Sequence, residues 1–325
     1  YGSMASAVSA DPKDRAELST WRTIGSTLAN MVIGVATPMV AYVVVDGKTV
    51  MSGSRMTIIA GVFSICAILC YIVCFKLTRE RVEVPASSQK VSASAIFKSI
   101  FTNRALLGII VAAIFVLLSQ LTVMSLAGYV YPNVYGSAAA QSTASLLGTV
   151  IMLIVCAPFA SKLAAKFGKK ELAVVSSICS ALVWLVCLIW RPASVWGFVA
   201  CYILANIGMG FFNTIIWAMI TDVIDDAEVR SGIREDGTIY SVYSFARKLG
   251  QAFSSGLVGA LLGIIGYTEA TAFDPAVTRG IFNMACIAPI IGFVCIVLAL
   301  VFLYPLNKKK VEENVAALAA RRNSK

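Results

Sequence analysis

Residues 105–136 read ALLGIIVAAIFVLLSQLTVMSLAGYVYPNVYG and contain no charged side chain. They open an uncharged stretch that continues to residue 161, which is long enough for two membrane-spanning helices of about 20 residues each. Pro132 and Gly136 supply turn chemistry, so the break between the two helices is expected at residues 131–136. The stretch therefore predicts two consecutive transmembrane helices joined by a turn.

The rest of the chain repeats this pattern. Uncharged or nearly uncharged stretches occupy residues 23–45, 56–75, 172–190, 192–221, 249–273 and 280–307. Hydrophobic residues make up 58% of the chain and charged residues 14%, which excludes an ordinary soluble domain. We therefore predict an all-α polytopic membrane protein with eight transmembrane helices.

Lysine and arginine residues collect in alternate connecting segments and in the tail. The opposite loops contain only Lys48, Arg55, Arg191 and Arg279. Because cytoplasmic loops hold the excess of basic residues, both ends of this chain are predicted to be cytoplasmic. This topology explains the net charge of +10, and we infer no nucleic-acid partner from it.

Cysteine and histidine usage limits the chemistry. The nine cysteines are scattered through apolar stretches, which favours small hydrophobic filler over a metal site. The chain has no histidine, so histidine-based triads and zinc sites are excluded. We expect no cofactor and no metal site within this chain.

Two adjacent cations, Arg247 and Lys248, lie about ten residues inside the predicted span 238–267. At about 1.5 Å per residue, Lys248 is roughly 15 Å along the helix, near the middle of a hydrocarbon layer of about 30 Å. A cation at that depth costs roughly 3 kcal/mol or more unless it faces protein, water or an anion. A functional site is therefore predicted; snorkelling to the interface, or pairing with a carboxylate, is the alternative.

A polar stripe surrounds Lys248 in the sequence. Its members recur at steps of three and four residues and so share one helix face: Ser241, Ser244, Lys248, Gln251 and Ser255. Such a stripe lines a water-filled cavity or packs closely on another helix. On the preceding span, Asn213 and Trp217 share a face, and Trp217 is interpreted as an interfacial anchor.

Residues 222–237 read DVIDDAEVRSGIREDG and predict a mixed-charge turn on the cytoplasmic side. A solvated loop is one interpretation. The other is a set of ion pairs that hold the inner face closed and break when the protein opens. The residues proposed for that gating role are Asp222, Asp225, Arg230 and Arg234.

Two segments carry a family resemblance: residues 1–4 leading to DPKDRAELSTWR at 11–22, and residues 222–251 with REDGTIYS at 234–241. Both resemble the glycoside-pentoside-hexuronide:cation symporters of the major facilitator superfamily, which include melibiose, glucuronide and xyloside carriers. The resemblance implies twelve helices in two bundles of six. This chain would begin at the inner end of the fourth helix, so its major facilitator fold would lack the first four helices. The carboxylates of the cation site would lie upstream.

On this resemblance, the chain divides into five segments. These are a cytoplasmic lead at 1–20 (the end of helix four and a loop), the last two helices of the N-terminal bundle at 21–77, a central cytoplasmic link at 78–99, a C-terminal six-helix bundle at 100–306, and a cytoplasmic tail at 307–325.

The resemblance also implies a set of substrate-binding residues. Lys248 matches the lysine of the eleventh helix that faces the sugar and cation site, Tyr243 and Ser244 fall at sugar-facing positions, and Arg22 matches the arginine of the fifth helix. Asn213 occupies the position where melibiose carriers have a tryptophan, which argues against melibiose. In the loop at 162–170, Ala165 replaces a usual aspartate, so the conformational lock of that loop would be weaker or replaced.

The implied function is symport of a glycoside, pentoside or hexuronide with sodium or a proton, by alternating access, in the bacterial inner (plasma) membrane. We expect a monomer whose partners are the sugar and the lipid bilayer, and no enzymatic activity. An intramembrane prenyltransferase is the alternative, with Asp222-x-x-Asp225 and Asp11-x-x-Asp14 as magnesium-diphosphate motifs. A membrane scaffold, which would bind no sugar, is a third possibility.

Overall fold

The computed structural model describes residues 12–45, 48–78, 103–231 and 236–323. The helices are α2 Pro12–Ala41, α3 Gly53–Leu77, α5 Arg104–Tyr129, α6 Ala138–Ile151, α7 Ala157–Phe167, α8 Lys169–Trp190, α9 Val195–Ser231, α10 Asp236–Ile264, α11 Pro275–Leu298 and α12 Lys308–Asn323. Short π-helical turns extend three of them: η1 Val130–Val134, η2 Met152–Cys156 and η3 Ala299–Leu303. Strands β1 Tyr42–Val45 and β2 Lys48–Met51 form an antiparallel hairpin in which Tyr42 pairs with Met51.

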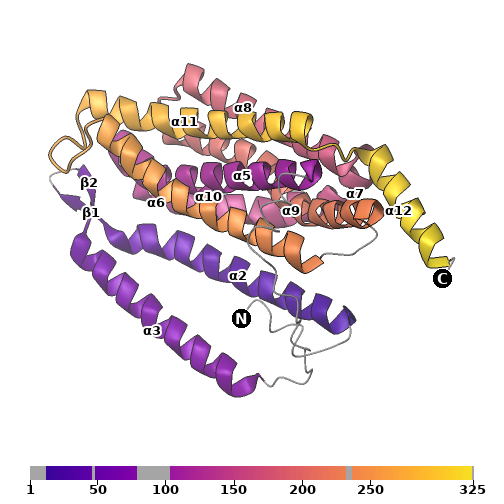
Figure 1. Cartoon of the computed structure of the whole chain (residues 1–325). Helices are drawn as coiled ribbons and strands as arrows, with labels where there is room; N and C mark the ends of the chain where they lie inside the picture. Colours follow the sequence, from indigo (N-terminus) through magenta and orange to yellow (C-terminus); the bar gives the residue numbers. More distant parts are fainter. Residues whose placement is uncertain (1–11, 46–47, 79–102, 232–235, 324–325) are drawn as a thin grey trace.

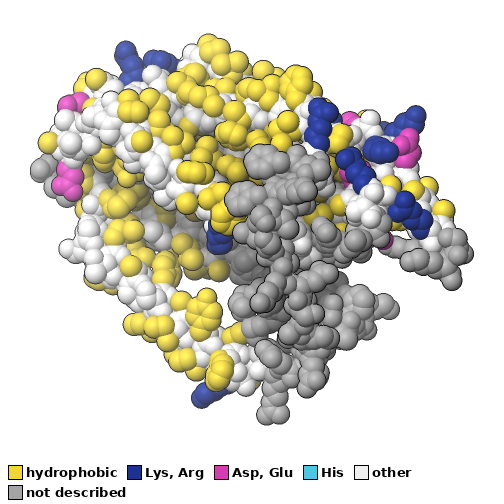
Figure 2. Space-filling view, viewed as in Figure 1, with side chains coloured by type: hydrophobic (Ala, Val, Ile, Leu, Met, Phe, Trp, Pro, Cys, Tyr) yellow, Lys and Arg dark blue, Asp and Glu magenta, His cyan; other side chains and the backbone are white. Residues whose placement is uncertain are grey.

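The helices confirm the all-α membrane fold. Within the described residues, seven helical segments are long and apolar enough to cross a membrane: Ile24–Ala41, Gly53–Leu77, Arg104–Val134, Ala138–Cys156, Lys169–Trp190, Val195–Ser231 and Pro275–Leu303. The eighth predicted span forms helix α10, which falls outside this set because Arg247, Lys248 and Gln251 interrupt its apolar character. Figure 2 shows hydrophobic side chains over the middle of the molecule and a cluster of Lys and Arg near α12.

Helix α5 lies at the centre of the bundle formed by helices α5 to α11, where it contacts α10 and α11 (Figure 1). Its span has the largest share of buried residues among the seven candidate spans, because α5 is packed by neighbouring helices of the bundle. Gly250 brings α10 close to α5: a Cβ atom at this position would lie 2.9 Å from the backbone oxygen of Ile114. Small residues allow such close approach between membrane helices.

The first two helices form a separate pair beside this bundle. Helix α2 contacts α6, whereas α3 contacts α2 and has no buried residue (Figure 1). The β1–β2 hairpin joins the two helices at the end of the molecule opposite to α12. We refer to these as the hairpin end and the α12 end. The predicted link at 78–99 lies almost wholly outside the described residues.

Two boundaries differ from the sequence prediction, and the predicted tail contains a helix. Helix α2 begins at Pro12, where proline is favoured in a first helical turn, rather than at about residue 21. The mixed-charge turn predicted from residue 222 is wrong as far as residue 231, because α9 continues to Ser231. The predicted tail contains helix α12.

Candidate functional site

Lys248 lies on the exposed face of α10, together with Ser241, Ser244 and Ser255. Its ammonium donates a hydrogen bond to Gln251 Oε1 at 3.2 Å. Among the described residues, no carboxylate forms an ion pair with Lys248. In Figure 1, α10 is the orange helix at the front of the bundle, on the side toward α2. Within the part of the chain that the structure describes, the predicted polar stripe is therefore an exposed face on which no other helix packs.

Arg247 points about 100° away from Lys248 around the helix axis, into an aromatic cluster. Its guanidinium donates to the Tyr243 hydroxyl at 3.3 Å and lies 5.2 Å from the centre of the Trp217 ring and 5.8 Å from that of Tyr243. Trp217 stacks on Tyr240 with ring centres 5.8 Å apart and meets Tyr243 edge-on at 5.4 Å. Cation–π contacts of this kind stabilise by roughly 0.5–2 kcal/mol. The two adjacent cations thus have different environments: Arg247 is held by the aromatic rings, and Lys248 is exposed.

This cluster changes the roles of two predicted residues. Tyr243 is fully buried, so it supports Arg247 and offers no surface to a ligand in this conformation. Trp217, interpreted from the sequence as an interfacial anchor, forms one wall of the cluster and is 43% exposed. The only sign of a role for Arg247 in the sequence was its position at the same depth as Lys248. Its contact with Trp217 of α9 depends on how the two helices pack, which the sequence does not show.

Asn213 lies one helical turn before Trp217 on α9 and is partly buried. Its amide donates to Gln120 Oε1 of α5 at 3.3 Å. Asn213 therefore brings a third helix to the same region. Ser244 is exposed beside Lys248. Arg22 lies in α2, but its side chain is outside the part of the chain that the structure describes.

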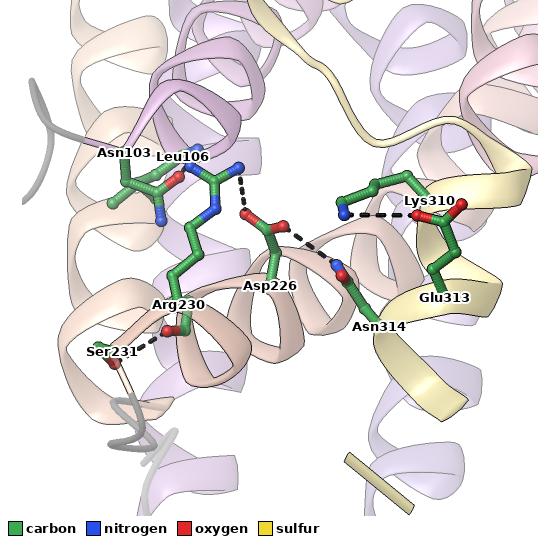
Figure 3. Close-up of polar contacts among 9 residues, drawn as sticks. Asn103, Leu106, Asp226, Arg230, Ser231, Lys310, Glu313 and Asn314 are labelled. Carbon is green, nitrogen blue, oxygen red and sulfur yellow. Dashed lines mark hydrogen bonds and ion pairs between the residues drawn. The ribbon is translucent and has the colours of Figure 1, made fainter. Parts of the chain in front are cut away.

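At the α12 end, the predicted gating residues form contacts within the bundle. Asp222 is 6% exposed and accepts a hydrogen bond from Lys169 Nζ at 2.6 Å, which joins α9 to the start of α8. Arg230 pairs with Asp226 of the same helix at 2.9 Å (Figure 3). Asp225 is partly buried on the same stretch of helix, and Arg234 lies outside the described residues. The two ion pairs hold neighbouring turns and helices of one bundle together.

Helix α12 adds contacts that the sequence did not predict. Asn314 donates to Asp226 Oδ1 at 3.0 Å, and Asp226 is 1% exposed (Figure 3). Arg321 donates to the backbone oxygens of Glu228 at 3.3 Å and Val229 at 3.0 Å. These carbonyls belong to the last turn of α9, which has no helical donors for them. Helix α12 thereby caps α9.

At the hairpin end, neutral hydrogen bonds join the α2–α3 pair to the bundle. The Tyr42 hydroxyl donates to Gly128 O at 2.7 Å, and Thr49 Oγ1 donates to Gly136 O at 3.0 Å. Ser142 Oγ donates to Val35 O at 3.1 Å. All three of these bonds engage either Val35 of α2 or a residue of the hairpin that follows α2. The two parts are therefore closed together at the hairpin end.

The prenyltransferase alternative gains no support from the acidic residues. Asp222 is engaged by Lys169, and Asp11 lies outside the described residues. Across the described ranges, no group of three or more His, Cys, Asp and Glu side chains could hold a metal ion.

A sequence model of the family described as MFS/sugar transport protein matches residues 1–308. Among relatives, the uncharacterized symporter YjmB of Bacillus subtilis is 30% identical over 95% of this chain and 66% of its own length. A glucuronide carrier protein homolog of Escherichia coli is 26% identical, over 99% of this chain and 69% of its own. A proposed sulfoquinovose importer of Salmonella typhimurium is 28% identical, over 100% of this chain and 67% of its own.

The chain thus spans about two thirds of the length of these relatives. The matches confirm the resemblance found in residues 1–22 and 222–251, and they agree with the multi-pass helical fold. They do not favour the prenyltransferase alternative, because the family and these relatives are membrane transporters and not enzymes. The chain belongs to the MFS/sugar transport protein family of multi-pass membrane proteins.

Proposed function

We propose that the protein containing this chain transports an acidic sugar across the bacterial inner membrane by alternating access, and that α9 and α10 form part of its substrate site. The observation that carries the proposal is the accessible ammonium of Lys248 beside the clamped Arg247. Both cations lie near the middle of α10, where a charge is costly unless an anion or water faces it. A substrate anion would supply that partner.

The substrate class follows from these charges. Glucuronide and sulfoquinovose, named for two of the relatives, are sugars with an acid group. Lys248 offers three donors on a flexible stem, which suits an anion that enters and leaves. Ser244 and Gln251 lie beside it to bind sugar hydroxyls, and the exposed rings of Trp217 and Tyr240 offer a platform for the apolar face of a sugar. We therefore favour a hexuronide or a related acidic glycoside over a neutral pentoside.

We propose that transport is coupled to sodium or to a proton. The family resemblance implies that the carboxylates for this cation come from other helices than the described ones. Lys248 would pair with those carboxylates when the site is empty, so that cation and sugar binding are linked. Opening toward the outside would break the bonds of Tyr42, Thr49 and Ser142 at the hairpin end.

Uptake measurements on the complete transporter in proteoliposomes test the proposal. We expect Lys248→Ala to lower uptake of a radiolabelled glucuronide, driven by a sodium or proton gradient, by about 10- to 100-fold. The reason is that a hydrogen bond to a charged group contributes roughly 1.5–3 kcal/mol. Lys309→Ala, which removes an exposed lysine of α12, is the matched control and should leave uptake unchanged. Equal uptake by the Lys248→Ala protein and the unmodified protein would contradict the assignment.

A further inference from the structure

A group of basic side chains from four helices gathers at the α12 end, around the short link between η3 and α12. We call this group the basic corner, and its members are Arg104 of α5, Lys162 and Lys166 of α7, Lys170 of α8 and Lys308 of α12. Figure 2 shows Lys and Arg side chains near α12, at the border of the hydrophobic surface. The basic corner is separate from the substrate residues assigned on α9 and α10.

Hydrogen bonds to the backbone bring these helix ends together. Lys170 Nζ donates to Tyr304 O at 2.6 Å, and Arg104 donates to a carbonyl oxygen of η3. Lys308 Nζ donates to Lys166 O at 3.1 Å, which joins the start of α12 to the end of α7. Because carbonyl groups are neutral, these bonds hold three cations in place without cancelling their charge. An excess of Lys and Arg on one side of a membrane protein orients it, but does not require cations of four helices to converge.

Acidic side chains do not balance the charge of the basic corner. Within the described ranges, four of its five cations form no ion pair with a carboxylate. The fifth, Lys308, lies 4.0 Å from Glu312, whose side chain is 67% exposed. Glu171, next to Lys170 in the sequence, is partly buried at the start of α8. The corner therefore presents a positive charge that an anion can neutralise.

Exposed apolar side chains lie on the same helix ends. Phe302 is 63% exposed, Phe167 54% and Val301 47%. The Lys166 ammonium lies 5.2 Å from the centre of the Phe167 ring, so cation and apolar surface adjoin directly. A phospholipid at the edge of a bilayer offers both complements, because its phosphate faces cations and its acyl chains face apolar side chains. A soluble anion would use the cations alone, so the combination favours a lipid.

We propose that the basic corner binds the phosphodiester headgroup of an anionic phospholipid. Basic groups between helix ends at a membrane surface bind such headgroups. A lysine ammonium has three donors, so Lys170 and Lys308 keep donors for phosphate oxygens after their carbonyl bonds. Lys162 and Lys166 are exposed and share one face of α7, because they are four residues apart. The bound lipid joins α5, α7, α8 and α12, and this binding does not rest on the proposed transport function.

Native mass spectrometry of the purified complete transporter, titrated with cardiolipin, tests the proposal. We expect saturable binding of cardiolipin and none of the neutral-headgroup phosphatidylcholine. Lys162→Gln and Lys166→Gln should each weaken cardiolipin binding by about fivefold, and together by about 25-fold, because each removes one charge near the headgroup. Lys166→Arg keeps the charge and should retain binding. Lys76→Gln is the matched control, since it removes an exposed lysine from the last turn of α3, outside the basic corner.

Three results would overturn the proposal. The first is equal binding of phosphatidylcholine and cardiolipin, which would mean that the headgroup charge is not recognised. The second is an equal loss in the Lys76→Gln and Lys166→Gln proteins, which would mean a diffuse attraction and no site. The third is displacement of cardiolipin by an equal concentration of glycerophosphoglycerol, a phosphodiester without acyl chains, which would identify a site for soluble anions. A melting curve for each variant checks that it is folded.

Discussion

The two ends of the molecule are held together by different kinds of contact. At the α12 end, an ion pair joins α8 to α9, and polar contacts from Asn314 and Arg321 join α12 to α9; none of these helices belongs to the α2–α3 pair. At the hairpin end, neutral hydrogen bonds from Tyr42, Thr49 and Ser142 cross between the α2–α3 pair and the bundle. A neutral hydrogen bond contributes only about 0.5–1.5 kcal/mol net, whereas removing one partner of a buried ion pair costs several times more. The bundle is thus braced by strong contacts, and its boundary with the pair by contacts that can break and re-form.

The largest effect is expected from breaking the brace at Asp222. Asp222→Ala leaves Lys169 without its carboxylate and should lower the free energy of unfolding by about 3 kcal/mol, the lower end of the range for buried pairs because Lys169 is 32% exposed. Thermal unfolding in detergent measures the change. Glu312→Ala removes a 67% exposed partner of Lys308 and should cost about 0–1 kcal/mol. Similar losses in both variants would mean that the α12 end is no more strongly braced than the surface.

An intermediate effect is expected from Asn314. Asn314→Leu leaves Asp226 Oδ1 buried without its donor, so the free energy of unfolding should fall by about 1–3 kcal/mol. The neighbouring Glu313→Ala changes a half-exposed pair with Lys310 and serves as the control (Figure 3). Hydrogen exchange of the last turns of α9 should be faster in the Asn314 variant only. If exchange there is unchanged, α12 does not cap α9 in the membrane.

The smallest effect on stability is expected from Tyr42→Phe, which removes one neutral bond across the boundary. The cost should be about 1 kcal/mol, and it should appear as easier separation of the pair from the bundle. Hydrogen exchange should therefore rise in the peptides that contain residues 33–41 and 138–145, and not in α9. Tyr71→Phe on the exposed surface of α3 is the control. A global rise in exchange would show that Tyr42 supports the whole fold and not the boundary.

The sequence predicted the helices of this fold because lipid imposes a simple rule: a spanning helix needs a long apolar stretch. It did not predict that α9 continues through its acidic end. Asp222 and Asp226 are tolerated there because Lys169 and Asn314, distant in sequence, supply their partners. A charged residue in the sequence predicts a polar segment, but the residues that neutralise or hydrogen-bond it can be identified only in the folded structure.

Only part of the candidate site could be predicted from the sequence, because the rest depends on contacts between helices. The accessible position of Lys248 agrees with the periodicity of the stripe on α10. Its functional role stays a prediction. The burial of Tyr243 and the clamp on Arg247 required knowledge of how α9 packs against α10, because Trp217 supplies the ring that holds the guanidinium. Adjacent residues of one helix point about 100° apart, so one pair of cations can serve two purposes.

The close contact between α5 and α10 at Gly250 also affects the position of Lys248. The two residues are two positions apart and point in nearly opposite directions from the helix axis. A methyl group at residue 250 would collide with the backbone of Ile114, so α10 would have to roll or retreat, and the amine on its other side would swing with it. The direction in which the Lys248 ammonium points therefore depends on the absence of a side chain at Gly250, on the opposite face of the same helix.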